Sequence, residues 1–346
     1  MKTNISAYTT LILFILLCLT SSCKEMVLGD EPDNNPESNF DLFWNDLDAH
    51  YGLFTVKTTN WDSLYQVYRP LVTSQSTNEE LFDILSEMIE PLNDSHTTIT
   101  NTLNQKTYTS GATLNTKAVS EFSRKLIESK YVSNFQRIGN SPIGIGSINN
   151  QDIGYIYINK MEGDASIIDK VIAKLKNHKA IIIDLRINSG GSDLYSERVA
   201  GAFADGEHFI YTVQTRNGKN HSDFTDKKEY YTSKAGAEQY LKPVVILTSR
   251  FTISAAEIFM LHMKSFSHIT QIGDTTAGDF SDISNTRFLP NGMAYSYSIQ
   301  KYLMPDGKSK DGIGHIPDVY IKNSKADIDA GNDWVLERAV EYINER

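Results

Sequence analysis

The sequence is poor in cysteine, in long apolar runs and in positive charge. Its two cysteines are Cys18 and Cys23, and the first lies in an N-terminal apolar stretch of nine residues, Leu11 to Leu19. A membrane-spanning helix needs about 20 apolar residues, so this stretch predicts a cleaved signal peptide over residues 1–22 instead. Cleavage leaves one cysteine, which excludes an internal disulfide. The folded chain is therefore expected to be stabilised by its core.

The scarcity of positive charge excludes one class of partner. Lys and Arg total 33 against 43 Asp and Glu, which gives a formal net charge of −10. Because the chain also has no basic run, nucleic acid is not expected as a partner. No two histidines are spaced as His-x-x-x-His, and the sequence predicts neither a metal site nor a cofactor.

The predicted signal peptide ends on small residues and a cysteine, Thr20-Ser21-Ser22-Cys23. This ending resembles the lipobox of bacterial lipoproteins, in which the cysteine is acylated and becomes the new N-terminus; a plain secretory signal is the alternative. Residues 23–38 are polar and predict a flexible tether. We therefore expect a membrane-anchored lipoprotein of the cell envelope, facing the periplasm or the cell surface.

Two folded regions follow the predicted tether. Residues 39–100 carry apolar side chains at helical spacing and a capping signature at Thr77, which predicts a helical N-terminal subdomain. Residues 101–346 alternate strand-like runs, such as 153–158 and 180–184, with helical stretches, such as 254–264. This alternation predicts an α/β core domain with buried strands. The sequence does not indicate an oligomeric state.

Two loops of the predicted core follow buried strands, where sites of α/β sheets usually lie. The first ends in Gly190 and Gly191, whose N–H groups could face a developing negative charge, although a tight turn is the simpler interpretation. The second leads into a helix that begins at Ser254. Ser254 and Glu257 fit a capping box, but a helix start also suits a nucleophile whose oxyanion is bound by the N–H of Ala255.

A third loop, Leu92-Asn-Asp-Ser95-His96-Thr, follows the helical subdomain. Seven other histidines compete with His96 for the role of a general base. His96 stands out because Asp94 and Ser95 offer hydrogen-bonding partners, and a neutral imidazole needs its tautomer fixed in order to act as a base.

The ordered set of motifs resembles the tail-specific or C-terminal processing peptidase family. It comprises Leu-x-Asp-Ser-His-Thr, Asp-Leu-Arg-x-Asn-x-Gly-Gly, Ser-Ala-x-Glu and Gly312-Ile-Gly-His-Ile-Pro-Asp318. The resemblance covers about Phe40 to Ile321 and is closer to the branch of the tricorn core and the interphotoreceptor retinoid-binding proteins. It implies a ClpP/crotonase-like core, no metal or cofactor, and a serine endopeptidase or carboxy-terminal processing peptidase that cleaves peptides or unfolded proteins.

The resemblance also implies how the serine is activated. Lysine-type members carry a lysine about 25 residues after the nucleophile, where this chain has Asp279, so a lysine base is excluded. Tricorn-like members use a relay of serine, histidine, a second serine and a glutamate, which implies Ser254, His96 and Ser95, with Asp311 at the glutamate position. The backbone N–H groups of Ala255 and of Gly190 or Gly191 are implied as the oxyanion hole.

Two further expectations concern substrate selection and activity. Many family members carry a PDZ domain, but the segment 106–143 is too short for one, so no PDZ domain is predicted. The alternative function is a non-catalytic binding protein for a hydrophobic ligand or peptide on the same scaffold, because fold does not fix function.

Overall fold

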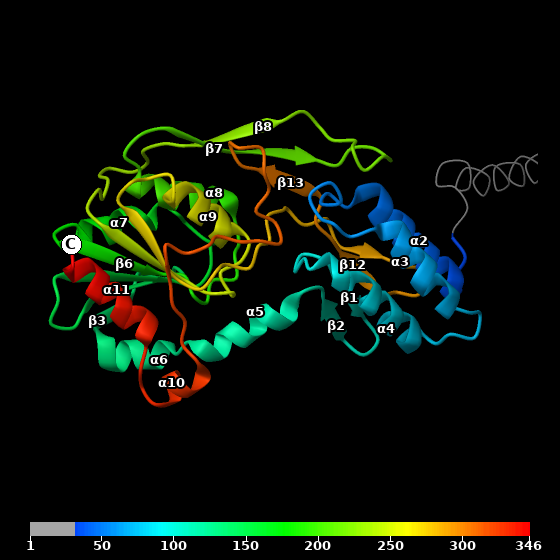
Figure 1. Ribbon diagram of the computed structural model, residues 1–346, viewed down its shortest axis with the longest axis horizontal. Helices are drawn as coiled ribbons and strands as arrows, with labels where there is room; N and C mark the ends of the chain where they lie inside the picture. Colours follow the sequence, from blue (N-terminus) through cyan, green and yellow to red (C-terminus); the bar gives the residue numbers. More distant parts are fainter. Residues whose placement is uncertain (1–31) are drawn as a thin grey trace, which may run out of the picture.

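The computed structural model describes residues 32–346, apart from the side chains of Thr113 and Leu114. The predicted signal peptide, Cys23 and most of the predicted tether lie outside the described residues. The described chain forms two packed parts, a smaller one that contains the N-terminal helices and a larger one around the main sheet (Figure 1). Within residues 32–346, no helix combines the length and the apolar character that a bilayer crossing requires.

The smaller part contains three helices that begin at side-chain caps. Asn35 and Asn60 accept from backbone N–H groups three residues later, and Thr77 forms the capping box predicted from the sequence. The helices cover a four-stranded antiparallel sheet of order β11-β12-β1-β2. The elements are α2 (Pro36–His50), α3 (Trp61–Tyr68), α4 (Asn78–Ile89), β1 (Thr98–Asn101), β2 (Lys106–Thr109), β11 (Arg287–Phe288) and β12 (Ala294–Ser296).

The core of the smaller part is built from two distant segments of the chain. Phe40, Phe43 and Leu85 pack in one cluster with Met293 and Tyr297. The smaller part therefore also contains residues outside the predicted 39–100, because β12 pairs with β1 and the residues around β12 pack against the helices.

The larger part is organised around a seven-stranded sheet of order β14-β10-β9-β6-β5-β4-β3. Five of its strands, β14, β10, β9, β6 and β5, run parallel to one another. The other two, β4 and β3, are added antiparallel at one edge. The strands are β3 (Val132–Arg137), β4 (Ile143–Ile148), β5 (Ile153–Ile158), β6 (Ala180–Asp184), β9 (Val244–Thr248), β10 (Ile269–Gly273) and β14 (Val319–Tyr320).

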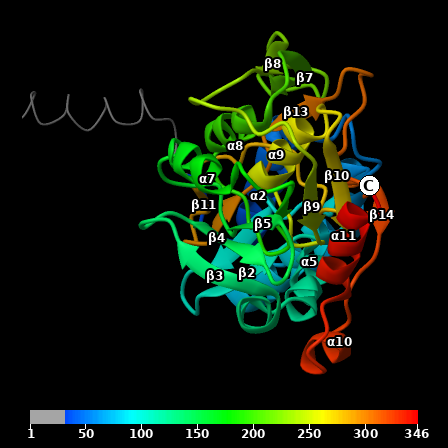
Figure 2. The ribbon, with the colours of Figure 1, turned by 90° about the vertical axis from the view of Figure 1, so that its left-hand side faces the viewer.

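Helices cover both faces of this sheet, as the continuous apolar runs predict. Ile181 and Ile183 of β6 point to the cluster beneath α7 (Ile167–Leu175), α8 (Asp193–Ala200) and α9 (Ala255–Met263). Ile182 points the other way, toward α11 (Trp334–Asn344), which lies on the opposite side of the strands from α7 (Figure 2). Burying each isoleucine contributes about 1.5–3 kcal/mol.

A third layer lies on the outer side of α9. There a sheet of order β13-β7-β8 packs Tyr211 and Tyr302 against Ile258 and Leu261 of the helix. The remaining elements are β7 (His208–Thr215), β8 (Lys228–Thr232), β13 (Gln300–Leu303), α5 (Ala112–Ala118), α6 (Arg124–Leu126), α10 (Lys325–Asp329), and short turns of 3-10 or π helix at Arg69–Leu71, Glu90–Leu92, Val119–Glu121, Ile127–Tyr131 and Gly201–Phe203.

Candidate active site

Ser254 occupies a strained turn between β9 and α9. Its backbone has φ 60° and ψ −125°, a left-handed conformation that costs a non-glycine residue about 1–3 kcal/mol. A helix-capping serine normally has an extended backbone instead. Its N–H donates to the Glu257 carboxylate at 3.2 Å, as in the predicted capping box. The backbone strain, however, is not explained by capping and is typical of a functional position.

The hydroxyl of Ser254 lies beside the imidazole of His96. Ser254 Oγ and His96 Nε2 are 3.1 Å apart, although the two residues are 158 positions apart in the sequence. His96 comes from the loop before β1, in the smaller part, and its side chain is 13% exposed. The structure thus places these two predicted residues within hydrogen-bonding distance, as a nucleophile and its base require.

The other nitrogen of the imidazole faces a carboxylate at longer range. His96 Nδ1 is buried, has no hydrogen-bond partner among residues 32–346, and lies 3.8 Å from Asp94 Oδ1. That distance is too long for a hydrogen bond. Asp94 is itself fully buried and fixed, since it accepts from the His96 N–H, from Thr97 Oγ1 and from Ser298 Oγ.

Ser95 has a different carboxylate partner from the one that the family resemblance implies. Its hydroxyl donates to Asp279 Oδ2 at 2.5 Å, and its N–H donates to Asp279 Oδ1 at 3.0 Å. Asp311 instead pairs with Lys57 at 2.5 Å and accepts from the N–H of Phe280. Among the described residues, the implied contact between Asp311 and Ser95 is therefore not formed.

Asp279 has a clear signal in the sequence. It stands at the end of Gly273-Asp-Thr-Thr-Ala-Gly-Asp279, the element that carries the base in lysine-type relatives. That position excludes a lysine base, but it also places any side chain there beside the serine and histidine loops. Lys57 gave no signal, because nothing in its local sequence marks a buried lysine.

Glu257 joins the serine turn to the Asp279 loop. Its buried carboxylate accepts from Thr276 Oγ1 at 2.6 Å and from the N–H groups of Gly278 and Asp279, both at 2.8 Å. Burial, and then the negative charge of Asp279, raise the pKa of Glu257 to about 8, while these hydrogen bonds oppose the rise. The sequence predicted only the capping role of this residue.

The predicted oxyanion donors separate into two groups. Gly190 N–H donates to Asn188 Oδ1 at 2.9 Å, so it is already used. The N–H groups of Gly191 and Ala255 have no acceptor among residues 32–346. Gly190 has φ +86°, and a Cβ there would lie 2.8 Å from the Ser254 Cβ. Glycine is therefore required at position 190 because the backbone packs closely against the serine turn, and not because its N–H donates to an oxyanion.

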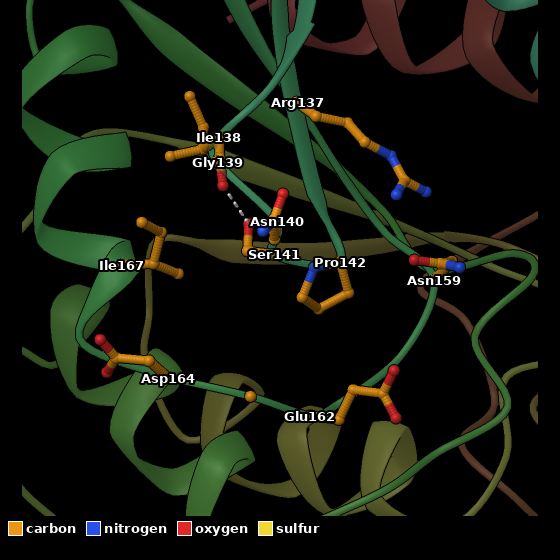
Figure 3. A pocket seen from close by; sticks show the side chains of 11 residues that line it. Arg137, Ile138, Gly139, Asn140, Ser141, Pro142, Asn159, Glu162, Asp164 and Ile167 are labelled. Carbon is orange, nitrogen blue, oxygen red and sulfur yellow. Dashed lines mark hydrogen bonds between the residues drawn. The ribbon is translucent and has the colours of Figure 1, made fainter.

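A pocket of about 600 Å³ is lined by the β3–β4 turn and the loop after β5, and neither Ser254 nor His96 lines it. Met161, which precedes the lining residue Glu162, pairs with the glycine loop: its N–H donates to Gly190 O and its carbonyl accepts from Ser192 N–H. Figure 3 shows Glu162 and Asp164 of the loop after β5 across a gap from Ser141 and Pro142 of the β3–β4 turn. In the described part of the chain, no three His, Cys, Asp or Glu side chains are grouped to hold a metal ion.

A strained serine hydrogen-bonded to a histidine, at the carboxyl ends of parallel strands and with free backbone N–H donors beside it, is typical of serine hydrolases. Comparison with known proteins agrees with this class. The model of peptidase family S41 matches residues 152–321, and that of the tricorn protease C1 domain matches residues 32–90. These matches support the assignment of the chain to the C-terminal processing peptidase family, S41.

Curated relatives match about half of the chain. A probable CtpA-like serine protease of Staphylococcus epidermidis is 33% identical over 179 residues, which is 50% of this chain and 34% of the relative. A protein of the same description from Staphylococcus aureus is 31% identical over 177 residues, again 50% of this chain and 34% of the relative. The chain thus matches about a third of the length of these relatives.

Solved structures match nearly the whole described chain. A proposed peptidase from Parabacteroides merdae superposes with a TM-score of 0.81 at 27% identity, covering 90% of this chain and 97% of that one. Mature CPAF in complex with lactacystin gives 0.67 at 12% identity, over 90% of this chain and 99% of that one. The predicted mixed α/β fold is confirmed by this likeness.

Proposed function

We propose that this protein is a serine peptidase that hydrolyses peptide bonds, with Ser254 as nucleophile and His96 as general base. The observation that supports the proposal most directly is the 3.1 Å separation of Ser254 Oγ and His96 Nε2. Family membership supports the reaction class. The positive φ of Ser254 supports a functional role, because a residue needed only as a cap gains nothing from that strain.

The geometry suggests the following sequence of steps. His96 Nε2 takes the hydroxyl proton as Ser254 Oγ attacks the carbonyl carbon, and it returns that proton to the leaving amine as the peptide bond breaks. The N–H groups of Gly191 and Ala255 bind the oxyanion, a contribution of about 3 kcal/mol for each donor in comparable sites. Water then gives a proton to His96 as its oxygen attacks the acyl carbon; as the ester bond breaks, His96 returns that proton to Ser254 Oγ and the new carboxyl group is released.

The groups behind His96 orient the imidazole and stabilise its charged form. Asp94 provides negative charge 3.8 Å from Nδ1. Asp279 fixes Ser95 through both the hydroxyl and the N–H. We propose Asp279, rather than Asp311, as the carboxylate that anchors Ser95, because it makes both contacts.

We further propose carboxy-terminal processing of peptides or unfolded proteins in the cell envelope. The pocket beside Met161 would accept part of the substrate, because it adjoins the loop that provides Gly191. A lipid on Cys23 would hold the domain at the membrane. Replacing Cys23 with alanine should then move the protein from the membrane fraction to the soluble fraction on immunoblots; a variant that stays in the membrane fraction contradicts the anchor.

The proposed activity is tested with a fluorophosphonate probe and an unfolded protein such as casein. Wild type should be labelled and should cleave casein, whereas Ser254→Ala and His96→Ala should lose both activities by at least about 1000-fold. Thermal melts should show that Ser254→Ala changes stability by no more than about 1 kcal/mol. Labelling or casein cleavage that persists in Ser254→Ala rules out Ser254 as nucleophile. A folded wild type without either activity favours the binding-protein alternative.

A further inference from the structure

A buried lysine lies behind the loop that carries Ser95 and His96. Lys57 belongs to the turn between α2 and α3, and its side chain is only 8% exposed. Its ammonium group contacts Asp311 Oδ1 at 2.5 Å and donates to the backbone carbonyl of Asn93 at 3.2 Å. Asn93 is followed directly by Asp94, Ser95 and His96. Lys57 therefore contacts both the histidine loop and an aspartate of the larger part.

These contacts close a ring around the loop. From Asn93 the chain runs to Ser95, which donates to Asp279. The next residue, Phe280, donates its N–H to Asp311 Oδ2 at 3.0 Å, and Asp311 returns the ring to Lys57. Each connection in the ring is a covalent bond, a hydrogen bond or an ion pair. The position of the His96 loop is thus determined jointly by Lys57, Asp279 and Asp311.

The charges explain why a lysine suits this position. Three buried carboxylates gather here, from Asp94, Asp279 and Asp311. Burial alone lowers the pKa of Lys57, but the negative charges of Asp311 and then Asp94 outweigh it, and the pKa lies above its usual value. The ammonium group therefore stays charged. Burial raises the pKa of Asp311 to about 7, and the charge of Lys57 opposes that rise, so Lys57 favours the ionised form of the buried carboxylate.

We propose that Lys57 is a positioning residue for the catalytic histidine: by bridging Asp311 and the Asn93 carbonyl, it fixes the loop that presents His96 to Ser254. This inference rests on the proposed peptidase function. Lys57 touches neither the substrate nor the reacting atoms, so its effect is on the alignment of His96. Because Lys57 comes from the smaller part and Ser254 from the larger one, the bridge makes this alignment depend on how the two parts pack.

The inference is tested by the rate at which a fluorophosphonate probe labels the full chain. Lys57→Met keeps the length of the side chain but removes its donors. It should lower the maximal labelling rate constant by about 10- to 100-fold, since a misplacement near 1 Å has that effect, and should leave the half-saturating probe concentration within about twofold. Lys176→Met is the matched control, because Lys176 forms an exposed ion pair with Glu238 at 2.9 Å. It should label like wild type.

A double variant separates positioning from stability. Lys57→Met with Asp311→Asn removes both charges of the ion pair, so the Asp311 carboxylate is no longer buried without its cation and the melting temperature should recover part of the way toward wild type. Labelling should stay slow, because the Asn93 carbonyl still lacks its donor. Wild-type labelling in a folded Lys57→Met, or full recovery of labelling in the double variant, overturns the proposal. A wild type that does not react overturns the peptidase proposal itself, and the role of Lys57 with it.

Discussion

Glu257 both caps the helix that follows Ser254 and contacts the loop that contains Asp279. The sequence Ser254-Ala-Ala-Glu257 predicts a capping box, and the carboxylate does accept from the Ser254 N–H. The same carboxylate also accepts from Thr276 and from the N–H groups of Gly278 and Asp279. One buried side chain therefore holds the nucleophile turn and the loop that anchors Ser95 at a fixed separation.

The raised pKa of Glu257 predicts a pH-dependent stability. The pKa is about 8 in the folded protein against 4.5 for the ordinary group. A raised pKa means that the native state binds the extra proton, so this contribution to stability is complete below about pH 4.5 and is lost as the pH rises through about 8. Relative to Glu257→Gln, wild type should lose on the order of 1 kcal/mol or more between about pH 5 and pH 8 in urea denaturation. Parallel pH curves for the two proteins would contradict this expectation.

At the scale of single elements, the first three residues of the Asp-Leu-Arg-x-Asn-x-Gly-Gly motif stabilise the fold. Arg186 is buried between Asp184 of β6 and Asp333, the residue that caps α11. Its guanidinium donates to both oxygens of Asp333, at 2.7 and 2.9 Å. The motif therefore combines two tasks: its arginine attaches α11 to the sheet, and its glycines shape the oxyanion loop.

Removing Arg186 should destabilise the fold strongly. Arg186→Met leaves two buried aspartates without their cation, which costs about 3–5 kcal/mol in the free energy of unfolding. Arg338→Met is the control, because Arg338 pairs with Glu345 at the surface at 3.3 Å and should contribute no more than about 1 kcal/mol. Urea titrations measure both values, and equal losses in the two variants would show that the buried network is not special.

The elements that the sequence predicts well are those with a local pattern. The runs 153–158 and 180–184 coincide with β5 and β6, and the helix expected at 254–264 is α9. Strands β11 and β12 have two and three residues, too few for a visible alternation, and β12 pairs with β1, which is distant in the sequence. The site shows the same contrast. Ser254 and His96 can be predicted because each lies in a local motif, whereas the Ser95–Asp279 pair and the role of Lys57 depend on contacts between residues distant in the sequence.

For the whole molecule, the decisive feature is that the proposed nucleophile, Ser254, and the proposed base, His96, belong to different parts. Close backbone packing joins these parts where α2 ends. Gly52 donates its N–H to Ser298 O at 2.8 Å. A Cβ on Gly52 would lie 2.4 Å from Gln300 N and 2.7 Å from Ile299 O, so the two backbones could not approach as they do.

Gly52→Ala should therefore reduce activity from a distance. The added methyl group must push the turn that carries Lys57 away from β13, and a displacement near 1 Å at His96 lowers turnover by about 100-fold. The overpacking should also cost about 1–3 kcal/mol of stability. Gly206→Ala is the control, since only the end of the His208 side chain, at 3.8 Å, approaches a Cβ there. Peptidase assays on folded variants test the expectation, and an active Gly52→Ala would contradict it.

Strand β12 lies near the end of the chain, so the smaller part completes its fold late in synthesis. The smaller part completes its core only with Met293, Tyr295 and Tyr297, although its helices begin at Pro36. During synthesis from the N-terminus, β1, the strand that follows the His96 loop, can pair early with β2 but lacks its second partner, β12, until most of the chain has been made. The assembled site is therefore a late product of folding, and under the proposed function a nascent chain would not yet attack the proteins around it.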